Sequence, residues 1–322
     1  MIILLSSEFD YSTNLVAKWL DSANQPFLRI NKESSKYRLD SIGNNKIYIL
    51  NRDTNERINL LDAHSCWWRR NGISGILPTP FSDDKELSEL LNVKIKNEYN
   101  SLVDYIQITL YNKCRINLGT PSFNLNRLRI LDLAGQAGLV IPEWIVTGSS
   151  RHILNYQQES QSVVTKAIDN GIYDEFKNKR YYTYTELLEP CFFSDENPME
   201  LFPSLITKTI KKKFEVRSFF LADKFYSMAI FSQQDESTII DFRKGNGSSQ
   251  TEPYQLPLLI ENQLRTLFKR ISLNSGSADF IVTDTNIHVF LEINPVGQFA
   301  MTSIPCNYNL HKKVANYLVY GT

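Results

Sequence analysis

The pattern of secondary structure that the sequence predicts changes once, near residue 119, and this change constrains the fold more than any other feature. Before it, short apolar runs such as 2–5 and 46–50 alternate with helix-like stretches, which indicates an α/β arrangement. After Gly119-Thr120-Pro121, the chain is predicted to form mainly strands in succession, with few helices between them. The sequence therefore predicts an α/β lobe followed by α+β lobes built on antiparallel sheets.

Turn-forming residues set the expected lobe boundaries. We divide the chain into an N-terminal α/β lobe (1–118), a small central lobe (119–203) and a C-terminal lobe with an antiparallel sheet (204–322). The second boundary follows from a group of prolines that ends at Pro203.

Apolar periodicity predicts the elements themselves. The main helices are expected at 12–23, 83–110, 124–137 and 257–273. The strands of the second half are expected at 140–147, 162–168, 181–187, 205–210, 214–221, 224–231, 277–282 and 287–293.

Composition and charge exclude several classes of protein. The 322 residues include 35 Lys and Arg against 35 Asp and Glu, so the formal net charge is zero and no global field draws the chain onto nucleic acid or an anionic membrane. No stretch approaches the roughly 20 apolar residues of a membrane helix. Cys66, Cys114, Cys191 and Cys306 are too widely spaced for a zinc or disulfide motif. We expect a cytoplasmic protein without nucleic-acid or membrane partners.

A candidate magnesium site lies near the carboxyl end. Glu292 and Asn294 are two residues apart in an apolar strand, so both side chains lie on one face. Asp279 lies in the preceding strand, which could pair with this one across the turn at 283–286. Carboxylate and amide oxygens are ligands that Mg²⁺ prefers when it also bridges phosphates. The alternative is the solvated face of an edge hairpin, but Pro295-Val296-Gly297 ends the strand and favours the metal site.

Two cations in apolar strands are candidates for binding anions. Lys166 lies within 163–168, where a buried lysine needs an anion such as phosphate, although a lysine at a sheet edge could reach solvent. Arg217 shares a strand face with Glu215, so it could instead form a structural ion pair. The run Lys211-Lys212-Lys213 is typical of a solvated face.

Other motifs are less specific. Arg69 and Arg70 follow two tryptophans and could grip a peptide carboxylate with a guanidinium fork, although Trp67 or Trp68 could equally belong to the core. The sequence has no phosphate-binding Gly-x-x-x-x-Gly-Lys-Ser/Thr loop. The four histidines have no spacing that suggests a nucleophilic triad.

The order of the candidate residues resembles the layout of the ATP-grasp superfamily. The resemblance rests on five residues in this order: Lys166, Arg217, Asp279, Glu292 and Asn294. The resemblance implies an ATP-grasp fold with a pre-ATP-grasp α/β lobe, a central lobe and a C-terminal lobe, and it implies ATP and Mg²⁺ as cofactors. It also implies that Lys166 contacts the ATP phosphates and that the two carboxylates and Asn294 hold magnesium. Arg217 would be a catalytic residue on the acyl phosphate or the substrate carboxylate.

The same resemblance implies a hinge that hydrogen-bonds adenine through its backbone. The implied hinge residues are Ser204, Leu205, Ile206, Thr207 and Lys208. This chain has Thr207-Lys208 where many relatives carry Gln-Glu, and Arg127 where many carry a phosphate-contacting lysine.

More narrowly, the chain resembles the ATP-grasp peptide maturases of the grasp-with-spasm type, which include the graspetide or microviridin macrocyclases and are distant relatives of ribosomal-protein glutamate ligases. The similar segments extend over nearly the whole chain: Trp67-Trp68-Arg69-Arg70, Asn126-Arg127-Leu128, Gly138, Ile141-Pro142, 214–220, Asp241-Phe242-Arg243, 291–299 and Cys306-Asn307-Tyr308-Asn309-Leu310. This likeness implies that Arg69 and Arg70 bind substrate and that Arg243 binds a carboxylate at the catalytic site. It implies a ribosomal precursor peptide, with leader and core, as partner, and homodimers occur among the relatives.

The resulting hypothesis is an ATP-dependent ligase. It would activate Asp or Glu side chains of the precursor as acyl phosphates and close ester or amide macrocycles with Ser, Thr or Lys. One alternative is an intermolecular ligase that adds an amino acid to a peptide or protein. The other is a nucleotide-binding regulatory protein without turnover.

Overall fold

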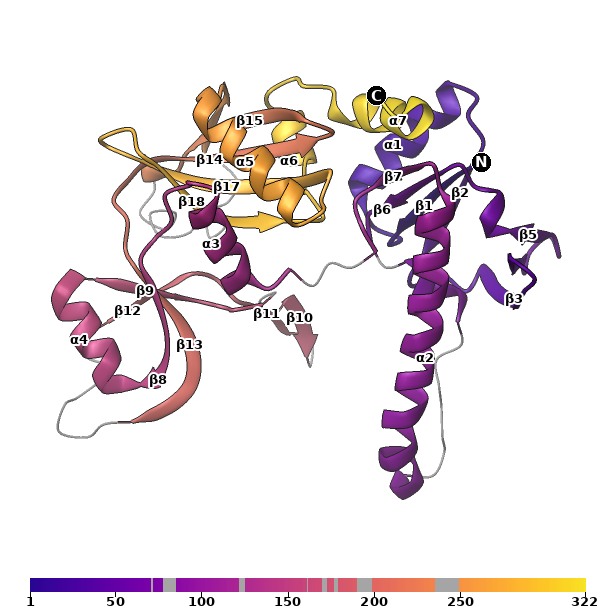
Figure 1. Cartoon of the computed structure of the whole chain (residues 1–322), viewed down its shortest axis with the longest axis horizontal. Coiled ribbons are helices and arrows are strands. Elements are labelled where there is room, and N and C mark those ends of the chain that lie inside the picture. The colour runs from indigo at the N-terminus through magenta and orange to yellow at the C-terminus, as the bar shows by residue number, and fades with distance from the viewer. Residues whose placement is uncertain are drawn as a thin grey trace. The chain divides into compact units, whose positions relative to one another are not determined.

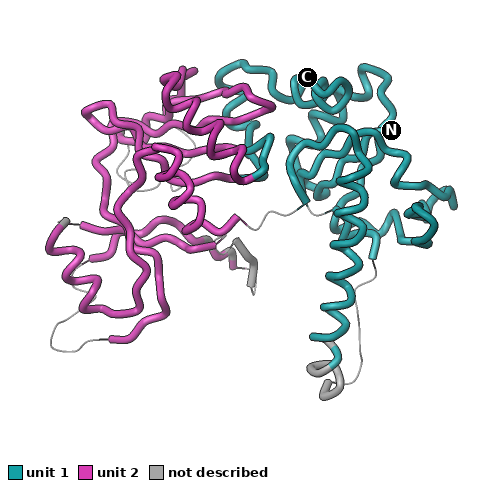
Figure 2. Tube along the Cα trace, viewed as in Figure 1, with its two compact units in different colours: residues 1–123, 272–276, 295–322 teal, residues 124–271, 277–294 magenta. Residues whose placement is uncertain are grey.

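The computed structural model of the chain contains two compact units (Figures 1 and 2). Unit 1 comprises residues 1–123, 272–276 and 295–322, and unit 2 comprises residues 124–271 and 277–294. The structure describes residues 1–70, 72–77, 85–121, 125–160, 162–169, 173–176, 179–189, 199–234 and 249–322.

A four-stranded parallel sheet forms the centre of unit 1. β1 (Ile2–Ser6) pairs with β2 (Phe27–Asn31) on one side and with β6 (Ser65–Trp68) on the other, and β7 (Ile116–Leu118) lies beyond β6. All residues of β1 are buried, so both faces of this strand are covered. Coverage on both faces explains why parallel strands are continuously apolar in sequence.

Helices pack around this sheet. α1 (Tyr11–Ser22) begins after Asp10, which caps it by accepting a hydrogen bond from the Thr13 amide. α7 (Leu310–Tyr320) packs against α1, β6 and β7. Unit 1 also contains the helices α2 (Lys85–Lys113) and α6 (Ala300–Ser303), the 3-10 helices η1 (Leu60–Asp62) and η2 (Gly72–Ile76), and an antiparallel sheet of β3 (Tyr37–Gly43), β4 (Lys46–Asn51) and β5 (Arg57–Asn59).

Unit 2 contains two larger antiparallel sheets and a hairpin. The four-stranded sheet has the order β12-β9-β13-β8, with β8 (Trp144–Ser149), β9 (Val163–Lys166), β12 (Glu186–Leu188) and β13 (Glu200–Lys208). The five-stranded sheet has the order β16-β15-β14-β17-β18, with β14 (Lys212–Leu221), β15 (Lys224–Phe231), β16 (Gln250–Tyr254), β17 (Ser275–Thr283) and β18 (His288–Asn294). The hairpin is β10 (Tyr173–Phe176) with β11 (Lys179–Tyr182).

A helix covers each of the two larger sheets of unit 2. α4 (Ser150–Ser160) places Ile153 against Val163 and Ile206 of the four-stranded sheet. α5 (Leu258–Arg270) stacks Phe268 on Phe220 of β14, with 4.4 Å between ring centroids. α3 (Arg127–Gln136) contacts β18 and α5, and the short η4 (Ser232–Gln234) follows β15. Among the described residues, no helix is both long and apolar enough to cross a membrane.

The predicted fold class is confirmed, and so are most strands of the second half. The predicted strand 181–187 is wrong, because β11 ends at Tyr182 and a separate strand begins at Glu186. The predicted strand 140–147 begins only at Trp144, and Val140 instead makes an isolated bridge to Val289. Three lobes divided at 118 and 203 stay a prediction, while the compact units place residues 295–322 with the N-terminal sheet.

Candidate active site

A pocket in unit 2 collects most of the predicted nucleotide and metal residues. It encloses about 950 Å³, counted out to its open mouth. Its lining includes Lys166, Thr207, Lys208, Arg217, Asp279 and Glu292. These residues come from β9, β13, β14, β17 and β18 and span more than a hundred positions of sequence, so it is the pairing of the strands that brings them together.

The register of β17 and β18 places the candidate metal ligands side by side. Asp279 is directly opposite Glu292, and Ser277 is opposite Asn294. Opposite residues of an antiparallel pair share a face, so the two carboxylates and the amide face one side. Among the described residues, no group of three or more His, Cys, Asp or Glu forms a metal cluster, and this set has two carboxylates and an amide. Oxygen donors of this kind fit magnesium that keeps part of its water and phosphate shell.

Each candidate carboxylate is paired with an arginine. Arg217 donates from Nε and Nη2 to the two oxygens of Asp279, at 2.7 and 2.6 Å. Arg127 donates from Nη2 to Glu292 at 3.0 Å and from Nη1 to the Ala167 carbonyl. The two pairs balance the charges of the two carboxylates and join four elements, β14 with β17 and α3 with β18. Arg217 thus has Asp279, on the neighbouring strand, as an ion-pair partner, in addition to whatever contact it makes with Glu215 of its own strand.

The connection between β13 and β14 contributes the next part of the wall. The implied hinge at Leu205, Ile206 and Thr207 lies in the middle of a sheet, where β13 pairs with β8 on one side and β9 on the other. The backbone N–H and C=O groups of these residues already bond to the neighbouring strands. A backbone hydrogen bond to adenine there stays a prediction, and the strand pairing argues against it. Thr209 and Ile210 follow the sheet and also line the pocket, and we take them as the better hinge candidates.

A buried ion pair in this pocket was missed by sequence reasoning. Lys212 lies only 7 % exposed and donates to Glu215, which also accepts from Ser232 Oγ at 3.3 Å. Side chains alternate along a strand, so Lys213 rather than Lys212 is expected on the same face as Arg217. The strand pattern therefore did not predict that Lys212 would lie in the pocket. The prediction of a solvated face holds for Lys211, which is exposed and pairs with Asp284 at 2.9 Å.

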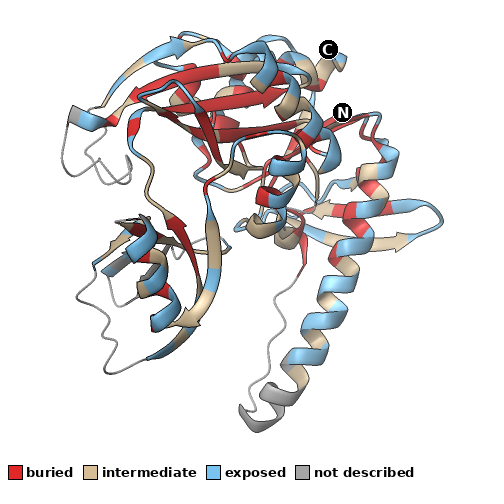
Figure 3. Ribbon diagram, turned by 60° about the vertical axis from the view of Figure 1, so that its left-hand side comes forward, coloured by how far each residue is buried: buried red, intermediate tan, exposed pale blue. Residues whose placement is uncertain are grey.

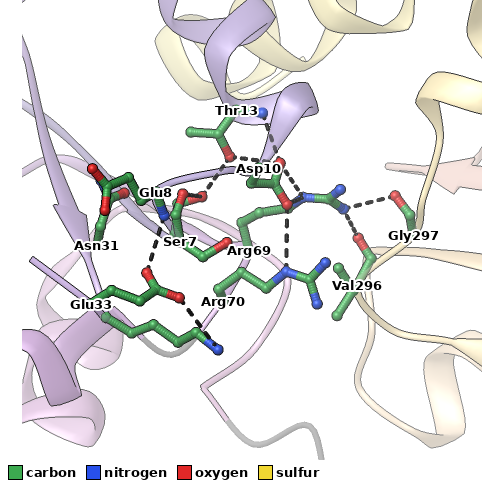
Figure 4. A network of polar contacts seen from close by, with 12 residues as sticks. Ser7, Glu8, Asp10, Thr13, Asn31, Glu33, Arg69, Arg70, Val296 and Gly297 are labelled. Atoms are coloured by element: carbon green, nitrogen blue, oxygen red, sulfur yellow. Dashed lines mark hydrogen bonds and ion pairs between the residues drawn. The ribbon is translucent and has the colours of Figure 1, made fainter. Parts of the chain in front are cut away.

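Arg69 lies in a closed polar cluster of unit 1 (Figure 4). Its Nε is 3.3 and 3.2 Å from the two oxygens of Asp10, and its Nη1 donates to the carbonyls of Val296 and Gly297. Burial alone would raise the pKa of Asp10, but Arg69, the Thr13 amide and Arg70 outweigh it and hold this pKa below 3.8. Burial lowers the pKa of Arg69 to about 10 against the opposing effect of Asp10, so the guanidinium stays charged at neutral pH.

A second pocket opens beside this cluster, at the carboxyl ends of the parallel strands. Phe9, Asp10, Glu33, Arg69 and Arg70 follow β1, β2 and β6, and Met301 of α6 completes this part of the lining. Ligands of open parallel sheets bind at this edge. The side chain of Arg70 is 37 % exposed, with its Nε 3.4 Å from Asp10, whereas the side chain of Arg69 is 4 % exposed. Substrate binding by Arg69 stays a prediction. Because the donors of Arg69 already bond to Asp10 and to two backbone carbonyls, Arg70 is the stronger candidate for binding substrate.

The remaining predicted residues have the following positions. Asn294 ends β18, on the face that carries Asp279 and Glu292. Leu205 and Ile206 are buried in the four-stranded sheet, and Lys208 lines the pocket while pairing with Glu143. Arg243 lies outside the described residues.

Comparison with known proteins points to one group of enzymes. No protein-family model matches the chain, and no curated protein matches its sequence. Among solved structures, the macrocyclase MdnC from Microcystis aeruginosa MRC, bound with precursor peptide MdnA, is 26 % identical with a TM-score of 0.77, over 100 % of this chain and 99 % of that one. A RiPP-associated ATP-grasp ligase from Chryseobacterium gregarium, in complex with ADP and a leader and core peptide, is 20 % identical with a TM-score of 0.78, over 100 % and 97 %.

A third structure has the same fold at lower identity. The ATP-grasp ligase PsnB, complexed with a phosphomimetic variant of its minimal precursor, Mg and ADP, is 13 % identical with a TM-score of 0.71, over 99 % and 97 % of the chains. The likeness spans both units, and the pocket of unit 2 brings together Lys166, Arg217, Asp279 and Glu292, four of the five residues on which the ATP-grasp resemblance rests. The chain is therefore similar, over its whole length, to ATP-grasp ligases that include a macrocyclase bound with its precursor peptide.

Proposed function

We propose that this protein uses ATP and magnesium to activate Asp or Glu side chains of a ribosomal precursor peptide and joins them to Ser, Thr or Lys of the same peptide. The observation that carries the proposal is the pocket of unit 2, where Asp279 and Glu292 meet Lys166, Lys208 and Arg217. Two acidic metal ligands among three cations are the combination that a magnesium-bound triphosphate requires.

The donor set fits magnesium. Asp279, Glu292 and Asn294 would hold it, since all three lie on one face of β17 and β18. Magnesium bound there would neutralise charge between the β- and γ-phosphates. Arg127 and Arg217 already balance the two carboxylates, so their guanidinium groups are placed to exchange this contact for a phosphate or a substrate carboxylate.

The reaction needs little covalent chemistry from the protein. A carboxylate oxygen of the peptide attacks the γ-phosphorus, the bond to the leaving ADP breaks, and an acyl phosphate results. A hydroxyl oxygen or amine nitrogen of the peptide then attacks the acyl carbon, phosphate leaves, and the attacking group loses its proton. Lys166 and Arg217 would stabilise the phosphoryl oxygens, and fixing both peptide groups in one site supplies much of the rate. Each linkage removes one water from the peptide.

The pocket at the edge of the parallel sheet is the proposed contact for the peptide in unit 1. Arg70 presents part of its guanidinium to this pocket, beside the 90 % exposed Phe9. A peptide carboxylate would be bound by the guanidinium, and a neighbouring apolar side chain would pack on the phenyl ring.

Mass spectrometry of a candidate precursor incubated with ATP, magnesium and the protein tests the proposal. We expect the peptide to lose one water per linkage while ATP becomes ADP and phosphate in equal number. The Asp279→Asn variant should leave the peptide unchanged. A gain of one amino-acid residue would identify an intermolecular ligase instead, and nucleotide binding without turnover over a panel of acidic peptides would identify a regulatory protein.

A further inference from the structure

A serine hydroxyl near the start of β17 is buried without a partner. Ser277 is 0 % exposed, and its Oγ has no hydrogen-bond partner among the described residues. β14 and β17, two internal strands of the five-stranded sheet, are buried along most of their length (Figure 3). A hydroxyl in this position costs free energy, because it has given up its bonds with water and made none in exchange. Its presence therefore needs a reason other than stability.

The strand register places Ser277 on the face that carries the candidate magnesium ligands. Ser277 is directly opposite Asn294, and Asp279 is directly opposite Glu292. The pairing is regular from 277 to 279, since the irregularity between the two strands comes only after Asp279. Side chains two residues apart on a strand share a face, and the Cβ atoms of opposite residues are about 5 Å apart. The hydroxyl therefore occupies the fourth corner of a group whose other three corners are the candidate ligands.

The two carboxylates of this group have other partners. Both oxygens of Asp279 accept hydrogen bonds from Arg217, at 2.7 and 2.6 Å. Glu292 accepts from Arg127 at 3.0 Å. Neither carboxylate bonds to Ser277, although both share its face of the sheet. A group that binds among these ligands is thus placed to supply the partner that the Ser277 hydroxyl lacks among the described residues.

We propose that Ser277 is a positioning residue for magnesium, whose hydroxyl accepts a hydrogen bond from a water bound to the metal. Magnesium held by few protein ligands keeps several of its waters, and each of these needs an acceptor. Groups that hydrogen-bond the ligands of a metal orient them and contribute to its affinity. The proposal rests on the proposed magnesium site, and it adds to the three ligands a residue that does not touch the metal itself.

Removal of the hydroxyl should change metal affinity and stability in opposite directions. Mn²⁺, which takes the same oxygen ligands, serves as the probe, and the EPR signal of free Mn²⁺ follows its binding to the protein saturated with ADP. Ser277→Ala should weaken this binding on the order of tenfold. Without metal or nucleotide, the same variant should unfold at a urea midpoint no lower than that of the natural chain, because it loses a buried hydroxyl that has no partner among the described residues.

Ser65→Ala is the matched control. The Ser65 hydroxyl is also 0 % exposed and without a hydrogen-bond partner among the described residues, but it lies on β6 of unit 1. Its removal should likewise not lower the urea midpoint, and it should leave the affinity for Mn²⁺ unchanged. An equal loss of Mn²⁺ affinity in both variants would overturn the proposal, because the effect would then not depend on the position of the hydroxyl.

Asp279→Asn in the same titration separates this inference from the proposed function. It should lose most of the Mn²⁺ binding, since it removes the charge of a direct ligand. Natural affinity in Asp279→Asn would move the metal away from this face and overturn both proposals. Weak binding in Asp279→Asn with natural affinity in Ser277→Ala would overturn the role of Ser277 alone. So would a clear fall in the urea midpoint of Ser277→Ala, because the hydroxyl would then be bonded within the metal-free chain.

Discussion

Two buried arginine–carboxylate pairs, one in each unit, show how little the residue types alone reveal about role. Arg69 with Asp10 and Arg217 with Asp279 have similar exposure, with side chains 4 and 3 % exposed in the first pair and 8 and 14 % in the second. The surroundings differ. Arg69 also binds two backbone carbonyls, which commits its donors to holding a turn, whereas the Arg217 pair lies in a pocket wall beside a second carboxylate and other cations. We infer that the first pair serves stability and the second chemistry.

The largest effect should come from removing the carboxylate of the pocket pair. Asp279→Asn keeps the side-chain shape but loses the charge that would hold magnesium, so the rate of ligation should fall on the order of 10³-fold. Steady-state release of ADP with a peptide substrate measures this loss. Asp284→Asn is the matched control, because the Asp284 side chain is 53 % exposed and pairs with the exposed Lys211. An Asp279 variant that keeps within tenfold of the natural rate would remove this residue from the metal site.

The pair in unit 1 should respond in stability. Asp10→Asn keeps the cap of α1, since asparagine caps helices as well as aspartate, but it leaves Arg69 buried without its counter-ion. The free energy of unfolding should fall by about 3 kcal/mol in a urea titration. Asp40→Asn, which breaks the exposed pair with Arg57, should cost less than about 1 kcal/mol.

The difference in unfolding free energy between the natural chain and the Asp10→Asn variant should depend on pH in a definite direction. The pKa of Asp10 is lower in the folded chain than its ordinary value of 3.8, so its charged form stabilises the fold above that pH. The contribution is lost as the pH falls through the lowered pKa. The natural chain and the Asp10→Asn variant should therefore converge in stability below about pH 3.8, and a gap that persists in stronger acid would contradict the assigned ion pair.

The two pairs also mark what sequence could and could not predict. Alternation along one strand and a hairpin turn sufficed to place Asp279 beside Glu292, because both signals are local. The bonds from Arg69 to the carbonyls of Val296 and Gly297 join residues more than two hundred positions apart, and no local sequence pattern predicts them. Lys212 was missed because, by alternation, it and Glu215 would lie on opposite faces of β14, so the strand pattern does not predict their buried contact. The hinge at 204–208 came from the family resemblance, and no local pattern in the sequence could show that β13 has strand partners on both sides.

A smaller effect should separate Arg70 from Arg69. Arg70→Ala removes the exposed guanidinium at the pocket of unit 1, so the KM for peptide should rise about tenfold while kcat changes little. The free energy of unfolding should change by less than about 1 kcal/mol, because the side chain is only partly buried. Arg70→Lys should recover part of the affinity, since a lysine keeps the charge but not the fork. An unchanged KM with a large loss of stability would place Arg70 with the structural cluster instead.

The smallest effect concerns His311, whose charge state depends on the same buried arginine. Burial and then Arg69 lower the pKa of His311 to about 4, and its Nε2 has no hydrogen-bond partner among the described residues. Since the unfolded chain has a histidine pKa near 6.5, it takes up the proton first as the pH falls, and stability is lost from about pH 6.5 downward. Between about pH 7 and about pH 5.5 the natural chain should lose about 1 kcal/mol that a His311→Phe variant keeps. His311 packs on Phe299, with 5.0 Å between ring centroids, so a phenyl ring suits the site. Equal losses in both chains would mean that His311 is charged in the fold, and a charge so close to Arg69 would require a counter-ion other than Asp10.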